Sequence, residues 1–283
     1  MNDNITINGK AIYTPKGAAL EYGRVGCNFY TGCPHDCEYC YLKRGAPSKQ
    51  LGGQEVKLKK CFKDRVDAFD VFCKEVRANL SHLRETGIFF SFTTDPLIKE
   101  TRELTISAIK FCVCVQIPVK VLTKNADFIR DENMDYLLES ERAKEYVSFG
   151  FTLTGHDEME KYASTNSERI EAMNYLHEMG FKTFASIEPV IDWAAAKEVI
   201  SASLDCCDHY KIGLRSGVKA GYYDIYASSM AIHEIVDDIL AMGRSVYLKD
   251  SVRKMLTKTH NLDDLDAFMR KTLDMDGKPF LIF

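Results

Sequence analysis

The sequence lacks any long apolar run. No stretch approaches the roughly 18 consecutive apolar residues that a membrane-spanning helix needs. The first ten residues, Met1 to Lys10, are polar overall, unlike the basic and then apolar start of a secretory signal. We therefore expect a cytoplasmic protein with no membrane partner.

The sequence also has no excess of positive charge and little proline. It carries 37 Lys and Arg against 41 Asp and Glu, so a net charge of -4 excludes a global positive field that would attract nucleic acid. Binding of that kind needs a local patch, and the candidate is the run KLKKCFKDR at 57–65 with Lys43 and Arg44. With 7 Pro in 283 residues and 46% hydrophobic residues, the composition is typical of an ordered globular protein.

Short runs rich in β-branched and aromatic residues alternate with longer segments of helical period. After the first gap the runs begin about 30 residues apart, the length of a strand, a helix and two loops. The seven predicted strands are Arg24–Phe29, Ile88–Thr93, Val119–Thr123, Val147–Thr152, Thr183–Ile187, Tyr210–Leu214 and Val246–Leu248. This repetition predicts parallel βα units.

Three of the intervening segments show apolar residues at spacings of three and four, namely Arg102–Phe111, Ser167–Met179 and Met230–Met242. Gly180 and Gly243 stand where helix C-terminal caps are expected. Spacing alone does not distinguish a barrel from an open doubly wound sheet. We favour an α/β fold with an incompletely closed parallel barrel.

Only one group of cysteines is crowded. Of the ten, Cys33, Cys37 and Cys40 fall within eight positions of the sequence GCPHDCEYCYLKR, directly after the first predicted strand. Three close thiolates indicate a metal site, at the end of a strand where parallel βα folds build their sites. No later CxxC or HxxxH completes a structural zinc site, and His35 is an awkward fourth ligand between two others.

The alternative is a [4Fe-4S] cluster held by three cysteines, which leaves one iron without a protein ligand. The CxxxCxxC spacing with Tyr39 before the last cysteine resembles the signature of the radical S-adenosylmethionine (radical SAM) superfamily. The resemblance implies a partial (β/α)6-type parallel barrel with a C-terminal extension. It also implies that S-adenosylmethionine is cleaved at the open iron to methionine and a 5'-deoxyadenosyl radical.

Further strand ends resemble the spore photoproduct lyase-like branch of that superfamily. They are SFTTDPL at 91–97, VLTKNADFIRD at 121–131, FGFTLTG at 149–155 and the run from 168 to 192. The resemblance implies an N-terminal extension at 1–22, a radical SAM core at 23–217 and a C-terminal extension at 218–283 that packs on or completes the barrel. Where that branch often carries a Glu-Pro pair after the fourth strand, this chain has KYAST at 161–165, which argues against an identical substrate pocket.

The resemblance places contacts to the methionine end of the cofactor on three strand ends. Thr93, Thr94 and Asp95 match the positions that contact the amino group, Lys124 matches a lysine that pairs with the carboxylate, and Thr152 reaches the carboxylate or ribose. Each has a structural alternative, such as helix capping by Asp95 before Pro96.

The same resemblance assigns the adenine end. The backbone at Tyr39 is expected to meet the adenine edge, and Ile212 and Gly213 of the sixth strand are expected to line the same pocket. The resemblance does not assign a catalytic residue, and three residues are candidates. Glu188, before Pro189, either contacts substrate or caps a strand end, and Cys61 and Cys73 are weak candidates for a hydrogen donor that pack structurally in the alternative reading.

The leading interpretation is a radical SAM enzyme that abstracts hydrogen from an unidentified substrate, with an external one-electron donor of flavodoxin or ferredoxin type. Nucleic acid is one candidate substrate, and a peptide or small molecule is the alternative. A non-catalytic iron-sulfur or zinc protein with a redox or binding role is an alternative of another class. It does not explain polar residues at successive strand ends.

Overall fold

The computed structural model describes residues 5–44, 48, 51, 53–260 and 262–272. Within them, an eight-stranded sheet has the order β1-β2-β5-β6-β7-β8-β9-β10, and β3 pairs with β4 separately. Neighbours from β2 to β10 are parallel, whereas β1 is antiparallel to β2. The strands are β1 (Ile12–Tyr13), β2 (Gly26–Cys27), β3 (Tyr30–Thr31), β4 (Lys57–Leu58), β5 (Ile88–Phe90), β6 (Val119–Thr123), β7 (Val147–Thr152), β8 (Lys182–Val190), β9 (His209–Leu214) and β10 (Ser245–Leu248).

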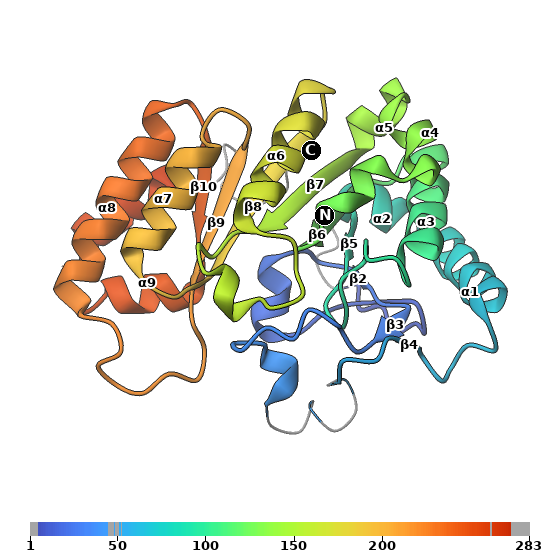
Figure 1. Ribbon diagram of the computed structural model, residues 1–283, viewed down its shortest axis with the longest axis horizontal. Helices are drawn as coiled ribbons and strands as arrows, with labels where there is room; N and C mark the ends of the chain where they lie inside the picture. Colours follow the sequence, from blue (N-terminus) through green and yellow to red (C-terminus); the bar gives the residue numbers. More distant parts are fainter. Residues whose placement is uncertain (1–4, 45–47, 49–50, 52, 261, 273–283) are drawn as a thin grey trace.

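Helices connect successive parallel strands and cover one face of the sheet, as Figure 1 shows. The α-helices are α1 (Arg65–Ala78), α2 (Leu80–Thr86), α3 (Arg102–Cys114), α4 (Asp135–Leu138), α5 (Glu141–Tyr146), α6 (Asn166–Glu178), α7 (Trp193–Ser203), α8 (Ile225–Ala241), α9 (Asp250–Leu256) and α10 (Leu262–Lys271). Short 3₁₀ helices are η1 (Gly17–Glu21), η2 (Tyr41–Lys43), η4 (Asp127–Arg130), η5 (Glu132–Met134) and η6 (Asp157–Met159). None of the helices in the described residues is long and apolar enough to cross a membrane.

Local sequence signals set several helix ends. Thr165 and Glu168 form a capping box at the start of α6, in which each side chain accepts from the other residue's backbone N–H. Asp192 caps α7 by accepting from the Ala195 N–H. Gly180 and Gly243, after α6 and α8, have φ of 93° and 68°, which favours glycine. The periodic segments and their glycine stops are therefore confirmed.

A small cluster of mostly aromatic side chains packs inside the curved sheet. Phe89, Phe184 and Tyr22 form a small cluster with the half-buried Phe92 and Leu122. A Cβ at Gly150 would lie 2.1 Å from the Phe184 ring, so this position on β7 has no room for a side chain. These rings fill the sheet's concave interior as side chains fill a barrel.

The sheet has two edges, β1 and β10, so the prediction of an incompletely closed parallel barrel is confirmed. The segment around η1 reaches across the open side to β10. Glu21 Oε1 accepts from the Asp250 N–H at 2.8 Å and from the Tyr247 hydroxyl at 3.3 Å. The N-terminal segment and β10, which lies in the predicted C-terminal extension, therefore approach each other at the opening.

Two sequence-based expectations fall partly outside the described residues. From its glycines and the run KLKK, the segment at 45–60 is expected to be an excursion between the first strand and its helix; it includes 45–47, 49–50 and 52, and its end forms β4 against β3. The predicted C-terminal extension includes 273–283. Beyond the three predicted helical segments, the structure also has α1, α2, α4, α5, α7, α9 and α10, and it adds the two-residue strands β1, β3 and β4.

Candidate active site

A cavity of about 520 Å³ opens at the carboxyl ends of the parallel strands. One part of its wall carries Cys33, Cys37 and Cys40 with Thr94, Asp95, Lys124 and Thr152 from the ends of β5, β6 and β7. Another part carries Tyr22, Ser186, Glu188 and Lys249. The fold thus brings residues that lie up to 233 positions apart, Lys16 to Lys249, around one cavity. Its position matches that of active sites in parallel βα folds.

The three cysteines of the loop are free thiols, with Cys37 buried and the other two half-buried. Among the residues that the structure describes, no three His, Cys, Asp or Glu side chains gather closely enough to hold a single metal ion. All three thiols line the cavity wall.

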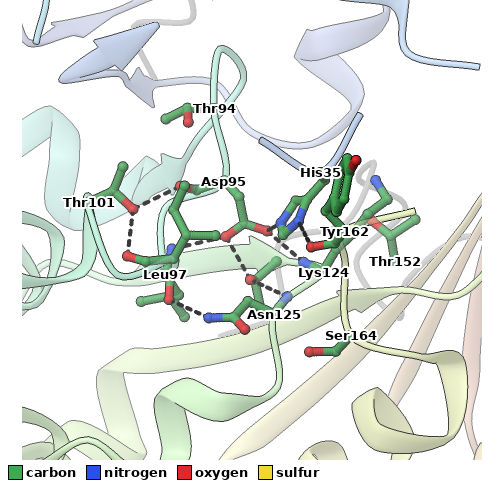
Figure 2. Close-up of polar contacts among 12 residues, drawn as sticks. His35, Thr94, Asp95, Leu97, Thr101, Lys124, Asn125, Thr152, Tyr162 and Ser164 are labelled. Carbon is green, nitrogen blue, oxygen red and sulfur yellow. Dashed lines mark hydrogen bonds and ion pairs between the residues drawn. The ribbon is translucent and has the colours of Figure 1, made fainter. Parts of the chain in front are cut away.

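His35, inside the cysteine loop, is held at both ring nitrogens. Its Nε2 lies 2.9 Å from Asp95 Oδ2, and its Nδ1 lies 3.0 Å from the Tyr162 carbonyl oxygen (Figure 2). Both ring nitrogens therefore have hydrogen-bond partners within the protein. His35 is therefore an anchor of the loop, with neither nitrogen left to bind zinc.

Asp95 organises the loops on this side of the cavity. Besides His35, its carboxylate accepts from the Thr123 hydroxyl at 2.7 Å and from the Lys124 and Leu97 N–H groups at 2.7 and 3.0 Å. Burial alone raises the pKa of Asp95, but His35 and the two backbone amides outweigh burial and lower it to about 2. The carboxylate is ionised and fully engaged within the protein.

Thr93 and Thr94, next to Asp95, differ in the hydrogen bonding of their hydroxyl groups. Thr93 donates to the Tyr30 carbonyl oxygen at 2.6 Å and lies outside the cavity lining. Thr94 lines the cavity, and its buried Oγ1 has no hydrogen-bond partner among the described residues. Figure 2 shows it apart from the dashed network. A buried hydroxyl without a partner is costly unless a ligand satisfies it.

Lys124 stands beside a buried charge cluster. Its Nζ lies 4.0 Å from Glu160 Oε1 and 5.4 Å from the centre of the Tyr39 ring. Burial lowers the pKa of Lys124, whereas Cys37 and Glu160 raise it, and the net result lies above its usual value. The ammonium group is therefore charged and lines the cavity.

Residues 27–193, more than half of the chain, match the sequence model of the radical SAM superfamily. The chain belongs to the radical SAM superfamily. Members of this superfamily use a [4Fe-4S] cluster and S-adenosylmethionine with an external electron donor.

Solved structures of other radical SAM proteins share the fold. Spore photoproduct lyase complexed with dinucleoside spore photoproduct superposes with a TM-score of 0.52 at 17% identity, over 70% of this chain and 58% of that chain. Streptococcus suis SuiB bound to S-adenosylmethionine gives 0.51 at 14% identity, over 77% and 44%. The chain thus spans less than two thirds of either protein. No curated protein matches this radical SAM chain in sequence.

The residues around the cavity fit the two radical SAM cofactors. Three free thiols share one wall, which suits a cluster with three cysteine ligands. Beside them stand the unpartnered Thr94 hydroxyl and the charged Lys124, which suit the amino and carboxylate groups of a methionine moiety. The observation that tests this fit is the orphaned Thr94 hydroxyl, because a ligand in the cavity would supply its missing hydrogen-bond partner.

The other end of the cavity in this radical SAM protein holds a second polar cluster. Lys249 Nζ lies 2.8 and 2.7 Å from the two oxygens of Glu188, and the Tyr22 hydroxyl donates to Glu188 at 2.5 Å. The ammonium side chain is only 3% exposed, whereas the carboxylate side chain is 25% exposed. Glu188 is therefore the group of this pair that faces an incoming molecule.

A further lysine lies behind this pair. Lys211 is fully buried on β9 with its Nζ 4.4 Å from the centre of the Tyr22 ring. Burial, followed by the charges of Lys120 and Lys249, lowers the pKa of Lys211 well below its usual range. Burial thus favours the neutral form of this lysine.

Several predicted site residues lie elsewhere. Ile212 is fully buried in the main core and does not line the cavity. Gly213 is also absent from the lining; a Cβ there would lie 2.8 Å from Glu188 Oε1 and 2.9 Å from Lys249 Cδ. Cys73 is buried in α1 and Cys61 is exposed, and neither lines the cavity. Their proposed roles stay predictions.

Sequence reasoning missed Tyr22, Glu160, Arg169, Lys211 and Lys249. Arg169 and Glu160 form an ion pair of 2.5 Å in which both side chains are fully buried. The capping box at Thr165 locates the start of α6, but nothing in the local pattern separates Arg169 from an exposed helical arginine. No signal in the sequence marks these residues as neighbours of the cavity.

Proposed function

We propose that Cys33, Cys37 and Cys40 hold a [4Fe-4S] cluster with one open iron, and that a substrate bound beside Glu188 loses a hydrogen atom. When bound, the cluster and S-adenosylmethionine supply the radical chemistry by reductive cleavage of the sulfonium. The observation that carries the proposal is that three free thiols, an unpartnered Thr94 hydroxyl and the Lys124 ammonium share one cavity. The proposed electron donor is a flavodoxin or ferredoxin.

We assign contacts to S-adenosylmethionine from these positions. Thr94 Oγ1 accepts from the amino group, and Lys124 pairs with the carboxylate. Thr152 lines the cavity beside them and remains the candidate for the carboxylate or ribose. Asp95 acts through the loops it binds, since its oxygens already accept four hydrogen bonds.

The adenine end follows the family resemblance. The backbone at Tyr39, which lines the cavity, is assigned to the adenine edge. Ile212 and Gly213 remain candidates through the backbone of β9. Phe89, Phe92 and Leu122 form an apolar part of the cavity wall, which disfavours water there.

Anaerobic reconstitution tests this function. The iron-loaded protein should be brown and should release 5'-deoxyadenosine from S-adenosylmethionine under reduction. Cys37→Ala should abolish the product, while Cys114→Ala, which changes an exposed cysteine outside the cavity, should retain it. A colourless protein that binds one zinc ion, or an iron protein with no affinity for S-adenosylmethionine, would contradict the proposal.

A nucleic-acid substrate is supported by one observation, the local charge around the cysteine loop. Residues 10–65 contain 11 Lys and Arg against 5 Asp and Glu, although the whole chain has a net charge of -4. Lys16 lines the cavity, and Lys60 and Lys63 are exposed after β4, which pairs with the strand that enters the cysteine loop. Clustered cations of this kind bind phosphates.

Fluorescence anisotropy with labelled single-stranded and duplex DNA at low salt tests this substrate. Replacing Lys60 and Lys63 together by Ala should weaken binding, while Lys182→Ala, an exposed lysine at the amino end of β8, should not. No binding at low salt would exclude nucleic acid, because phosphate contacts are strongest there. A peptide or small molecule would then be the substrate, identified by label transfer in mass spectrometry.

A further inference from the structure

The segment after β7, around η6 and the KYAST sequence, is hydrogen-bonded to the cysteine loop. The Glu38 N–H donates to the Met159 carbonyl oxygen at 2.9 Å, and the Tyr162 N–H donates to that of His35 at 3.3 Å. The Tyr39 hydroxyl donates to Glu160 Oε1. Residues 159–162, which we call the clasp, therefore contact the loop at three points between Cys33 and Cys40.

Within the clasp, Glu160 is held in place by a buried ion pair. Its second oxygen accepts from Arg169 at 2.5 Å, and both side chains are fully buried. Arg169 also donates to the carbonyl oxygens of Thr152 at 2.6 Å and Ser164 at 2.8 Å. A buried pair with its remaining donors satisfied has one permitted geometry, so the end of β7 and the start of α6 hold Glu160 rigidly.

The charges of this group leave one cation in excess. Arg169 and Lys124 share the single carboxylate of Glu160, but Arg169 takes the short contact and Lys124 Nζ remains 4.0 Å away. The side chain of Lys124 is 19% exposed and lines the cavity. Lys124 is thus held near Glu160 while its ammonium group stays available to an anion in the cavity.

We propose that Glu160 is a positioning residue for cofactor binding. Through the Tyr39 hydroxyl it fixes the backbone between Cys37 and Cys40, and through its charge it holds Lys124 at the cavity wall. This inference rests on the proposed function, because it assigns Tyr39 and Lys124 to S-adenosylmethionine. It adds a buried residue that touches neither cofactor and acts through two residues that do.

A double-mutant cycle on the iron-loaded protein tests the proposal. We expect Tyr39→Phe and Glu160→Gln each to raise the Kd for S-adenosylmethionine about tenfold, since each removes or weakens a hydrogen bond to a charged group. The double variant should lose no more than Glu160→Gln alone, because Tyr39→Phe removes a link that Glu160→Gln already breaks. Tyr175→Phe, on α6 outside the clasp and with an exposed ring, should stay within about twofold of the wild type.

Iron content and the electron paramagnetic resonance spectrum of the reduced cluster give a second readout. Addition of S-adenosylmethionine should perturb the spectrum of the wild type more than that of Tyr39→Phe at equal iron content. If Glu160→Gln does not fold, Tyr39→Phe alone decides, because it leaves the Glu160–Arg169 pair intact. Unchanged affinity in Tyr39→Phe, or a hundredfold additive loss in the double variant, would overturn the positioning role.

The binding measurements distinguish failure of the proposed function from failure of the role assigned to Glu160. If the iron-loaded wild type does not bind S-adenosylmethionine, the proposed function falls and this inference falls with it. If the wild type binds and Tyr39→Phe binds equally well, only the role of Glu160 is lost.

Discussion

His35 and Asp95, 60 positions apart in the sequence, form a buried ion pair of 2.9 Å between the cysteine loop and the end of β5. The remaining ring nitrogen of His35 donates to the Tyr162 carbonyl oxygen. The loop that carries the three thiols is therefore tied to two different strand ends before any cofactor binds. Such pre-organisation lowers the entropy that cluster binding must overcome.

Asp95→Asn should destabilise the protein by about 3–5 kcal/mol, because it removes the buried carboxylate that accepts from His35 and three further donors. Urea unfolding of the apoprotein followed by circular dichroism measures this. Asp127→Asn is the control: Asp127 pairs with Arg102, but its side chain is 66% exposed. Exposed pairs contribute about 1 kcal/mol or less. Equal losses in the two variants would contradict the buried ion pair.

Gly213→Ala should destabilise the protein by about 1–3 kcal/mol, as overpacked positions do. The new Cβ would lie 2.8 Å from Glu188 Oε1, so the Glu188–Lys249 pair must shift. In a Glu188→Ala background the same change should cost less, because the clashing Glu188 atoms are gone and only Lys249 Cδ remains close. Thermal unfolding of the four proteins measures the coupling. Purely additive effects would show that Glu188 does not occupy the space beside Gly213.

His156 should contribute stability that disappears at alkaline pH. Partial burial lowers its pKa, but the hydrogen bonds to Glu158 and Asp192, at 2.7 and 2.6 Å, outweigh burial and raise the pKa above 6.5. A raised histidine pKa stabilises the folded state below the unfolded value of about 6.5. That contribution is lost as pH rises through the folded-state pKa.

His156→Gln should therefore lower the melting temperature more at pH 6 than at pH 9. His82→Gln is the matched control, because His82 forms no ion pair within the described residues, and its effect should not depend on pH in this way. A pKa for His156 at or below 6.5 in an NMR titration would contradict the prediction.

Local sequence patterns were enough to predict much of the fold and part of the candidate site. Short apolar runs predict strands, and apolar residues at helical spacing predict helices. Each of the seven predicted strands overlaps a strand of the sheet. The cysteine spacing likewise lies within eight positions, so it is visible without a structure. These features are local, and the chemistry of neighbouring residues is enough to specify them.

The tertiary structure alone decided which distant residues meet. Lys211 and Arg169 look like ordinary exposed cations in the sequence, yet both are fully buried because one lies on the inner face of β9 and the other pairs with Glu160. Tyr22 reaches Glu188 from the N-terminal segment, and Lys249 reaches it from the end of β10, two strands away from β8 in the sheet. The sequence determined the strands and the thiol cluster by itself. The partners of each buried charge followed from strand order and register, because they depend on contacts between segments that no local pattern records.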